Sequence, residues 1–154
     1  MTDLLRHTLA TVAYRGGKVV RGVPPDFANF RSGESTRTPI QILAHIGDVL
    51  DWACYLARGQ KTWNDSTPQS WDHETQRFFD ALQRLDRQLS NEELKCDAGH
   101  LFSGPIADVL THIGQLAILR RMAGVPIRGE NYFIADIETG RVGPQQSAPK
   151  REFE

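Results

Sequence analysis

Residues 103–126 read SGPIADVLTHIGQLAILRRMAGVP, and this stretch decides the fold class. Its apolar residues recur at steps of three and four, which is the spacing of an α-helix. Pro105 suits the first turn of such a helix, and Gly124 followed by Pro126 is a typical helix end. Because the stretch is apolar on nearly all sides before Arg120, we expect it to be the most buried helix of the protein.

Three further stretches have the same periodicity, at about residues 2–20, 38–58 and 67–89. The second and the third each begin with the dipeptide Thr-Pro, in which the threonine can cap a helix and the proline suits its first position. No alternating strand pattern of any length competes with these helices. The sequence therefore predicts an all-α protein built as a four-helix bundle.

The connectors predict the order of the helices. The first and the third connector are long enough to run the length of a helix of about 20 residues, about 30 Å, whereas the middle connector is shorter. Two long crossovers around one short turn are typical of an up-up-down-down bundle. We expect the bundle to occupy residues 1–130.

Residues 131–154 form a C-terminal tail in this interpretation. The tail contains a small apolar cluster, Tyr132, Phe133 and Ile134, which we expect to pack on the bundle. After Gly143 the chain has few apolar residues, so a loose end is expected there.

Composition and charge exclude several classes of protein. The chain has 154 residues, 40% of them hydrophobic, and a formal net charge of −1, without a basic stripe that would bind nucleic acid. It has no apolar run long enough to span a membrane, and its first residues lack the apolar centre of a signal peptide. Cys54 and Cys96 have no CxxC spacing, which fits a reduced compartment. We expect a soluble cytoplasmic protein whose partner is a small molecule, not nucleic acid or a membrane.

Two polar residues interrupt the apolar surface of the last helix. Asp108 and His112 are four residues apart, about 40° from each other around the helix, and share their face with apolar residues. On the second helix, His45 also lies in an apolar stripe. Two imidazoles and one carboxylate from facing helices can hold a metal ion and leave a position open for water or substrate. Asp48 and Gln115 are placed to orient the imidazoles of His45 and His112.

Simpler interpretations of these residues remain open. A single histidine on an apolar face is more often a core residue with a satisfied hydrogen bond than a metal ligand. Asp108 lies near the predicted start of its helix, where the helix dipole favours an acid without any metal. The dipole explains Asp108, but it does not explain His45 or His112.

Two stretches resemble the DinB/YfiT-like superfamily of metal-dependent proteins. RTPIQILAHIGDVLDWA, residues 37–53, is similar to the second helix of that family, and DVLTHIGQLAILRRMAGVPI, residues 108–127, is similar to its fourth helix. The resemblance covers about residues 1–130. It implies a four-helix bundle, commonly dimeric, with a metal held by His45 and by the pair Asp108 and His112. Many relatives have a histidine and one branch has a glutamate where this chain has Asp108.

The same resemblance implies a function. Members of the superfamily include thiol S-transferases and thiol-dependent isomerases, so we expect a metal-dependent transferase or hydrolase acting on a small electrophile, with a low-molecular-weight thiol as a possible cofactor. Two histidines and a carboxylate suit zinc or nickel, and also manganese or iron(II). Arg120 is placed to hold a carboxylate of the substrate or thiol, or else to offset the helix dipole. The alternative is a non-enzymatic ligand-binding or interaction protein with a degenerate metal site.

Overall fold

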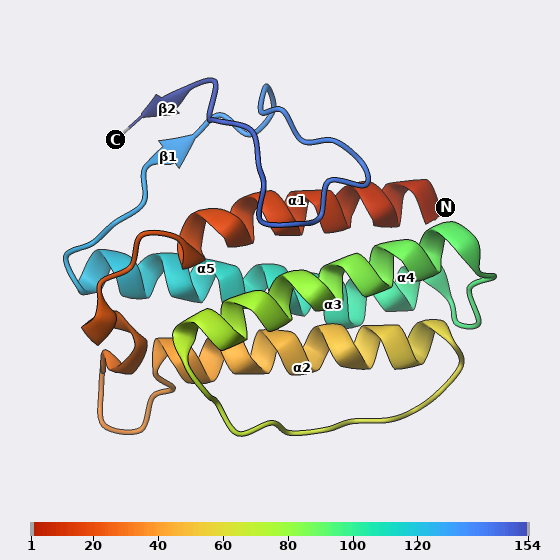
Figure 1. The fold of residues 1–154 in the computed structure, drawn as a ribbon, viewed down its shortest axis with the longest axis horizontal. Coiled ribbons are helices and arrows are strands. Elements are labelled where there is room, and N and C mark those ends of the chain that lie inside the picture. The colour runs from red at the N-terminus through yellow and green to blue at the C-terminus, as the bar shows by residue number, and fades with distance from the viewer. Residues whose placement is uncertain (1, 154) are drawn as a thin grey trace.

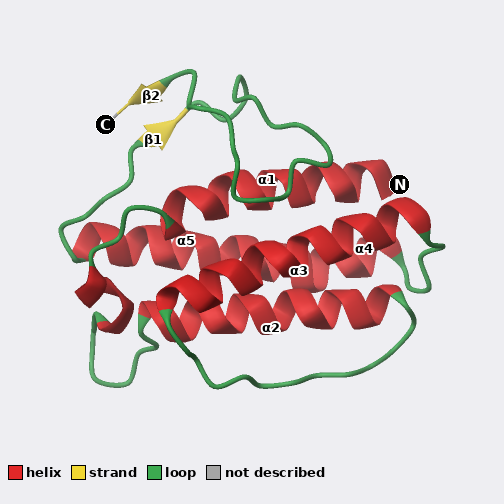
Figure 2. Cartoon of the chain, in the orientation of Figure 1, coloured by secondary structure: helices red, strands yellow, loops and turns green. Residues whose placement is uncertain are grey.

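The computed structural model describes residues 2–153, and the chain is mainly helical, as its periodicity predicts. Four long helices form the body of the protein, and they pack side by side (Figure 1). They are α1 (Thr2–Val20), α2 (Pro39–Ala57), α3 (Trp71–Asn91) and α5 (Ala107–Met122). Figure 2 shows the shorter elements, which are the 3₁₀ turn Pro25–Asn29, α4 (Ala98–Leu101), the π-turn Phe102–Ile106, β1 (Gly129–Glu130) and β2 (Glu152–Phe153).

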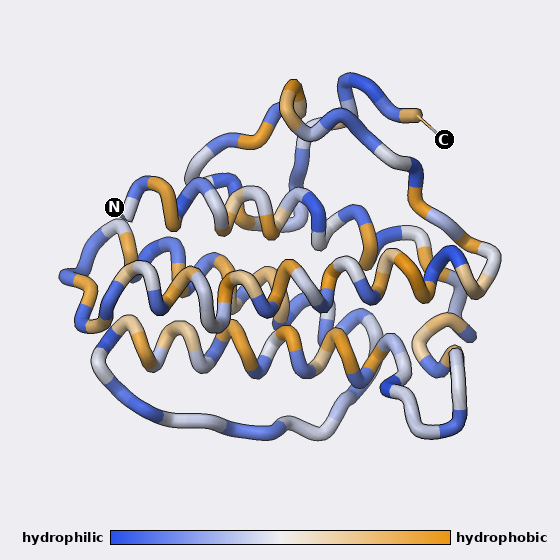
Figure 3. The backbone as a smooth tube through the Cα atoms, turned by 180° about the vertical axis from the view of Figure 1, so that it is seen from behind, coloured by the Kyte–Doolittle hydropathy of each residue, from blue (hydrophilic) through white to orange (hydrophobic). Residues whose placement is uncertain are grey.

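The four long helices enclose one apolar core. Helices α1 and α2 each contact both α3 and α5, so every long helix has two long neighbours. Figure 3 shows hydrophobic residues along these helices, while the long connector from α2 to α3 is mostly hydrophilic. The largest core side chains are fully buried and come from all four helices; they include Leu9, Ile46, Phe78, Leu82 and Leu116. Their burial removes apolar surface from water, which is the dominant stabilising contribution.

The direction of α2 relative to α3 contradicts the predicted helix order. Asp48 on α2 contacts Arg77 on α3, and further along both helices the Cys54 carbonyl accepts a hydrogen bond from Gln88. Both contacts advance in the same direction, so α2 and α3 run parallel (Figure 1). Residues 58–70 must therefore cross the whole length of the molecule between them.

The other contacts complete the order. Arg6 at the start of α1 pairs with Asp86 near the end of α3, so these two helices are antiparallel. Arg120 near the end of α5 reaches the carbonyl of Val19 at the end of α1, so α1 and α5 run parallel. The prediction of an up-up-down-down arrangement is wrong, because the first helix is antiparallel to the second and the second is parallel to the third.

Two misplaced helix boundaries explain that error. Helix α3 begins at Trp71 rather than at residue 67, with Ser70 Oγ accepting the His73 N–H at 3.1 Å, so the middle connector is longer than predicted. The last helical rod, which consists of α4, the π-turn and α5, begins at Ala98 rather than at Pro105. The third connector is therefore short. Part of the long first connector is folded into the 3₁₀ turn Pro25–Asn29.

Pro105 lies inside the last helical rod instead of starting it. It falls in the π-turn Phe102–Ile106, between α4 and α5. Proline has no N–H to donate and its ring crowds the carbonyl one turn earlier, so an ordinary α-helical turn does not accommodate it well. The wider π-turn allows the helical rod to pass through this position, and such turns occur frequently at functional sites.

The C-terminal tail is anchored more firmly than predicted. Tyr132 packs edge-to-face on Tyr14 of α1 with ring centroids 6.2 Å apart, but Phe133 is 97% exposed, so the predicted apolar cluster does not pack as a unit. The expected loose end is wrong as far as residue 153, because β2 pairs antiparallel with β1. Figure 2 shows both strands on the outer side of α1.

Candidate metal centre

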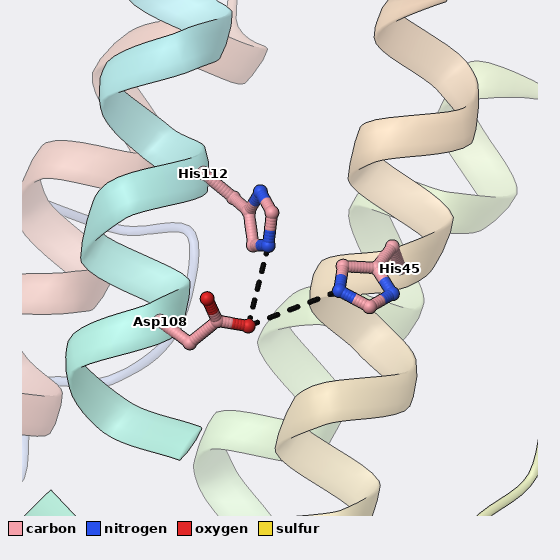
Figure 4. A group of neighbouring side chains, drawn as sticks. All are labelled: His45, Asp108 and His112. Carbon is pink, nitrogen blue, oxygen red and sulfur yellow. Dashed lines mark ion pairs between the residues drawn. The ribbon is translucent and has the colours of Figure 1, made fainter. Parts of the chain in front are cut away.

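The three predicted ligand residues meet between α2 and α5 (Figure 4). Asp108 Oδ2 lies 3.2 Å from His112 Nε2 and 3.8 Å from His45 Nε2. The two imidazole rings are 4.7 Å apart between centroids and nearly perpendicular. One ligand atom from each residue can be chosen so that all lie within 4.8 Å of one another. Two helices thus bring two imidazoles and a carboxylate to one point.

The centre is open to solvent on the side of its carboxylate. The side chains of His112 and His45 are 11% and 21% exposed, whereas that of Asp108 is 47% exposed. The expectation that Asp108 lies within an apolar stripe is therefore wrong, because this face of α5 is at the edge of the helix packing. An exposed carboxylate avoids the cost of burying a charge and leaves room beside the imidazoles for a ligand.

The helical rod begins well before Asp108, and this affects the explanation of Asp108 by the helix dipole alone. Residues Leu101, Phe102 and Ile106 all have helical backbone angles, so the chain is already helical before Asp108. The unpaired amide groups that attract an acid are confined to the first turn of a helix. They belong to the turn capped by Asp97, which accepts the His100 N–H. Asp108 is not at that helix end.

Gln115 contacts His112 as the sequence suggests. Its Oε1 lies 2.8 Å from His112 Nδ1, one turn further along α5. Because an amide oxygen can only accept a hydrogen bond, this arrangement assigns the proton to Nδ1. In the neutral ring, Nε2 then carries the free lone pair, and this is the nitrogen that faces Asp108 and His45.

Asp48 does not orient His45. Its Oδ1 accepts a hydrogen bond from Arg77 at 3.0 Å and its Oδ2 accepts the Ser66 N–H at 3.1 Å. Arg77 also donates to the carbonyl of Ala44, the residue before His45, at 2.6 Å. The side chain predicted to support an imidazole instead belongs to an ion-pair network that joins α2, α3 and the connector 58–70.

Arg120 also has a different role from the one expected. Its guanidinium donates to the Val19 and Arg21 carbonyls at 3.1 and 2.6 Å and to the Val125 carbonyl at 2.9 Å. These contacts tie the end of α5 to the end of α1, and burial lowers the pKa of Arg120. The residue is 7% exposed and its donors are directed at backbone, so it does not offer a carboxylate-binding group at the candidate centre.

Two residues of the centre had no signal in the sequence. The ring of Trp63, in the connector 58–70, lies 5.9 Å from that of His45 and also 5.9 Å from that of Trp52. Trp63, rather than Trp52, therefore borders the histidine. Arg37, just before α2, lines the same small hollow as His45. Burial lowers the pKa of His45, and the nearby charge of Arg37 lowers it further.

A larger cleft opens beside the centre. Its volume is about 750 Å³, and His112 and Gln115 form part of its lining. Its other walls come from the beginning of α2 and the second half of α5, together with the connector before α2. Ligand sites of this size hold drug-sized molecules.

The two cysteines lie elsewhere. Cys54 is on the α3-facing side of α2, with its Sγ 4.0 Å from the Ala81 carbonyl, and burial raises its pKa. Cys96 precedes α4, and burial raises its pKa as well. Both are free thiols. Neither has the lowered pKa of a reactive cysteine.

No protein-family profile, curated protein sequence or solved structure matches the chain. Within residues 2–153, none of the helices combines the length and the apolar character that crossing a membrane requires. The function is therefore inferred from the geometry of the centre and from the cleft beside it.

Proposed function

We propose that the chain is a four-helix bundle of the DinB/YfiT-like kind that binds a divalent transition-metal ion. His45, Asp108 and His112 would hold the ion. The proposed activity is that of a metal-dependent transferase or hydrolase acting on a small electrophile, with a low-molecular-weight thiol or water as the nucleophile. The observation that carries the proposal is the convergence of three ligand atoms from two helices, with Asp108 Oδ2 between the two imidazoles.

The donor set and its spacing fit a metal ion. At metal–ligand distances of about 2.0–2.2 Å, the ligand atoms of a tetrahedral site are about 3.3–3.6 Å apart. The separations of 3.2 and 3.8 Å between Asp108 Oδ2 and the two Nε2 atoms are close to this range. The lone pair at His112 Nε2 is oriented by Gln115, which is a support that metal-ligating histidines usually have.

The donor types favour particular ions. Two imidazoles with one carboxylate suit zinc or nickel, and manganese or iron(II) can also accept this set. When bound, such an ion acts as a Lewis acid that lowers the pKa of a thiol or water next to it. Three protein ligands leave a fourth position open, as in catalytic sites.

The protein's own residues supply positioning. The carboxylate of Asp108 lies on the open side of the centre, where it can accept a proton. The ring of Trp63 packs against that of His45 on one side of the centre. The cleft beside His112 gives a substrate a place next to the centre.

One observation favours the alternative of a non-enzymatic binding protein. Asp108 has a short side chain and is 47% exposed, and its Oδ2 already lies 3.2 Å from His112 Nε2 and 3.8 Å from His45 Nε2. A His–Asp–His cluster of this kind can be stable without an ion. This alternative predicts that the cleft binds a ligand whether or not metal is present.

Metal titration tests the proposal directly. Protein treated with chelator and then dialysed is titrated with zinc, nickel, manganese and iron(II) against a competing indicator dye. We expect one ion per chain, loss of binding in His45→Ala and His112→Ala, and retained binding in Asp108→Glu. His73→Ala, an exposed histidine on α3, is the matched control and should bind as the wild type does.

Two outcomes contradict the proposal. One is the absence of stoichiometric binding of any of the four candidate metals. The other is binding that His45→Ala leaves unchanged. If one ion per chain binds, thiol transfer to a small chromogenic electrophile is measured with the metal-loaded protein and with His45→Ala.

A further inference from the structure

We propose that the 750 Å³ cleft beside the candidate centre binds an amphipathic carboxylate, with Arg37 holding the carboxylate and α5 supporting the apolar body. This inference rests on the proposed function in one respect, because it names the substrate class of that centre. The binding itself needs no metal and can be tested without one.

Both apolar and polar side chains line the cleft. Ile42 on α2 and Leu119 on α5 are among its apolar residues, and its polar residues include His112, a member of the candidate centre, and Gln115. Two further wall residues, Ile118 and Met122, are 56% and 54% exposed. Water-exposed apolar surface of this kind favours a ligand with a hydrocarbon portion.

Arg37 is the cationic residue of this cleft. It lines both the large cleft and the smaller hollow that contains His45, so it stands where the two meet. Within residues 2–153, no carboxylate lies within ion-pair distance of Arg37, whereas Arg6, Arg77 and Arg84 each pair with acids.

The chemistry of these walls selects the ligand. An arginine without a partner recognises a carboxylate through paired hydrogen bonds. The rest of the lining is apolar or uncharged apart from His112, so the cleft offers nothing to a second charge. Ser32 also lines the cleft, and its hydroxyl can donate a further hydrogen bond to a carboxylate. A ligand with one negative charge and an apolar chain matches both Arg37 and the apolar residues of the cleft.

The test uses three probes with the same chain length. Octanoate, 1-octanol and octylamine are titrated into ¹⁵N-labelled, chelator-treated full-length protein, and amide shifts are followed by NMR. We expect octanoate to bind about tenfold more tightly than 1-octanol, and octylamine to bind most weakly. The shifts should concentrate at residues 36–42 and 111–122, which line the cleft.

Variants separate the charge from the apolar wall. Arg37→Gln should weaken octanoate about tenfold and leave 1-octanol unchanged. Leu119→Ala should weaken both probes, and its folding is checked from its amide spectrum. Arg87→Gln removes another exposed arginine, on α3 and outside the cleft, and should change neither affinity.

Several outcomes would overturn the inference. Equal affinities of octanoate and octanol, an unchanged octanoate affinity in Arg37→Gln, or shifts elsewhere on the molecule each rule out the proposed recognition. The inference is also ruled out if sedimentation shows a dimer that buries this face and prevents octanoate from binding. Failure here with intact metal binding leaves the proposed metal centre standing. Octanoate binding without any metal binding removes that centre and leaves this inference standing.

Discussion

At the scale of the residue, the protonation of His45 depends on its neighbours. Burial lowers its pKa from the ordinary value of 6.5, and the charges of Arg37 and His112 lower it further, while Asp108 acts in the opposite direction. Burial disfavours the charged imidazolium, and a nearby cation does the same. The ring is therefore neutral at neutral pH, which is the form that binds a metal ion.

The first prediction concerns Arg37. Replacing Arg37 with glutamine removes a positive charge near His45, so protonation becomes easier and the pKa of His45 should rise toward 6.5. The measurement is an NMR titration of the His45 ring proton in chelator-treated protein. Arg87→Gln is the control and should leave that pKa unchanged. An unaltered pKa in Arg37→Gln would mean that Arg37 does not lie near the histidine.

The second prediction concerns Gln115. Gln115→Leu removes the oxygen that accepts the His112 Nδ1 hydrogen bond. Loss of such a support commonly weakens metal binding about 10- to 100-fold, and we expect that loss for zinc here. Gln115→Glu keeps an acceptor at the same place and should bind zinc at least as well as the wild type. Equal affinities in the leucine variant would show that the contact does not prepare His112.

At the scale of the element, the packing of α1 on α3 depends on a glycine. A Cβ atom added at Gly16 would lie 2.4 Å from the Phe78 Cζ atom, which is closer than real contacts allow. The glycine that weakens α1 as an isolated helix is therefore what lets α3 approach. Gly114 on α5 differs, because nothing lies within 4 Å of its added Cβ.

The third prediction compares these two glycines. Gly16→Ala should lower the free energy of unfolding by about 1–3 kcal/mol, because Phe78 must move. Gly114→Ala should raise it by up to about 1 kcal/mol, because alanine favours a helix. Urea unfolding followed by circular dichroism measures both. If both variants gain stability, the close approach of α1 and α3 is wrong.

The connector 58–70 is held to the helices by Arg77. The guanidinium contacts Asp48 on α2, Glu74 on α3 and Ser66 in the connector. Its side chain is 19% exposed, while the carboxylates of Asp48 and Glu74 are 7% and 2% exposed. Two nearly buried acids thus depend on one arginine, whose contacts also position the backbone beside His45.

The fourth prediction tests that dependence. Arg77→Met leaves two nearly buried carboxylates without a cation and should cost about 2–4 kcal/mol of unfolding free energy. It should also speed proteolysis within residues 58–70. Arg84→Met is the matched control, because Arg84 is 44% exposed and its pair with Asp51 should contribute less than about 1 kcal/mol. Equal effects of the two variants would contradict the role assigned to Arg77.

At the scale of the whole molecule, the C-terminal tail is joined to α1 through a buried acid. The side chain of Glu130 has no exposed surface and accepts hydrogen bonds from the Tyr14 hydroxyl and, at 2.6 Å, from Lys18. Arg15 adds a cation–π contact to the ring of Tyr132 at 3.9 Å. The tail is therefore held on the outer face of α1 by these polar contacts and by the ring of Tyr132, not by the apolar cluster as a unit.

The fifth prediction follows from the phenol of Tyr14. Burial, together with the hydrogen bond to Glu130, raises its pKa well above 10. Above pH about 10 the unfolded chain loses this proton while the folded protein retains it, so stability should fall as pH rises. In Tyr14→Phe this decline should be shallower. Urea midpoints at pH 8 and pH 11 measure the difference, and parallel declines in both proteins would contradict the assignment.

Helix content and the positions of the candidate ligand residues were predictable because both depend on local spacing. Periodic apolar residues predicted every long helix, and the bounds of α1 were predicted correctly. Asp108 and His112 lie on one face of their helix because they are four residues apart, whatever the rest of the chain does. His45 required one further assumption, that its apolar face meets that of α5.

The sequence by itself determined the helices and which side chains share a face, because these follow from the geometry of a single helix. Only the tertiary structure decided the helix directions, the partners of Asp48 and Arg120, and the approach of Arg37 and Trp63 to His45. Those features depend on which elements become neighbours in space. Neighbours are set by the core packing of the whole chain and by connectors, whose irregular sequences carry no periodic signal.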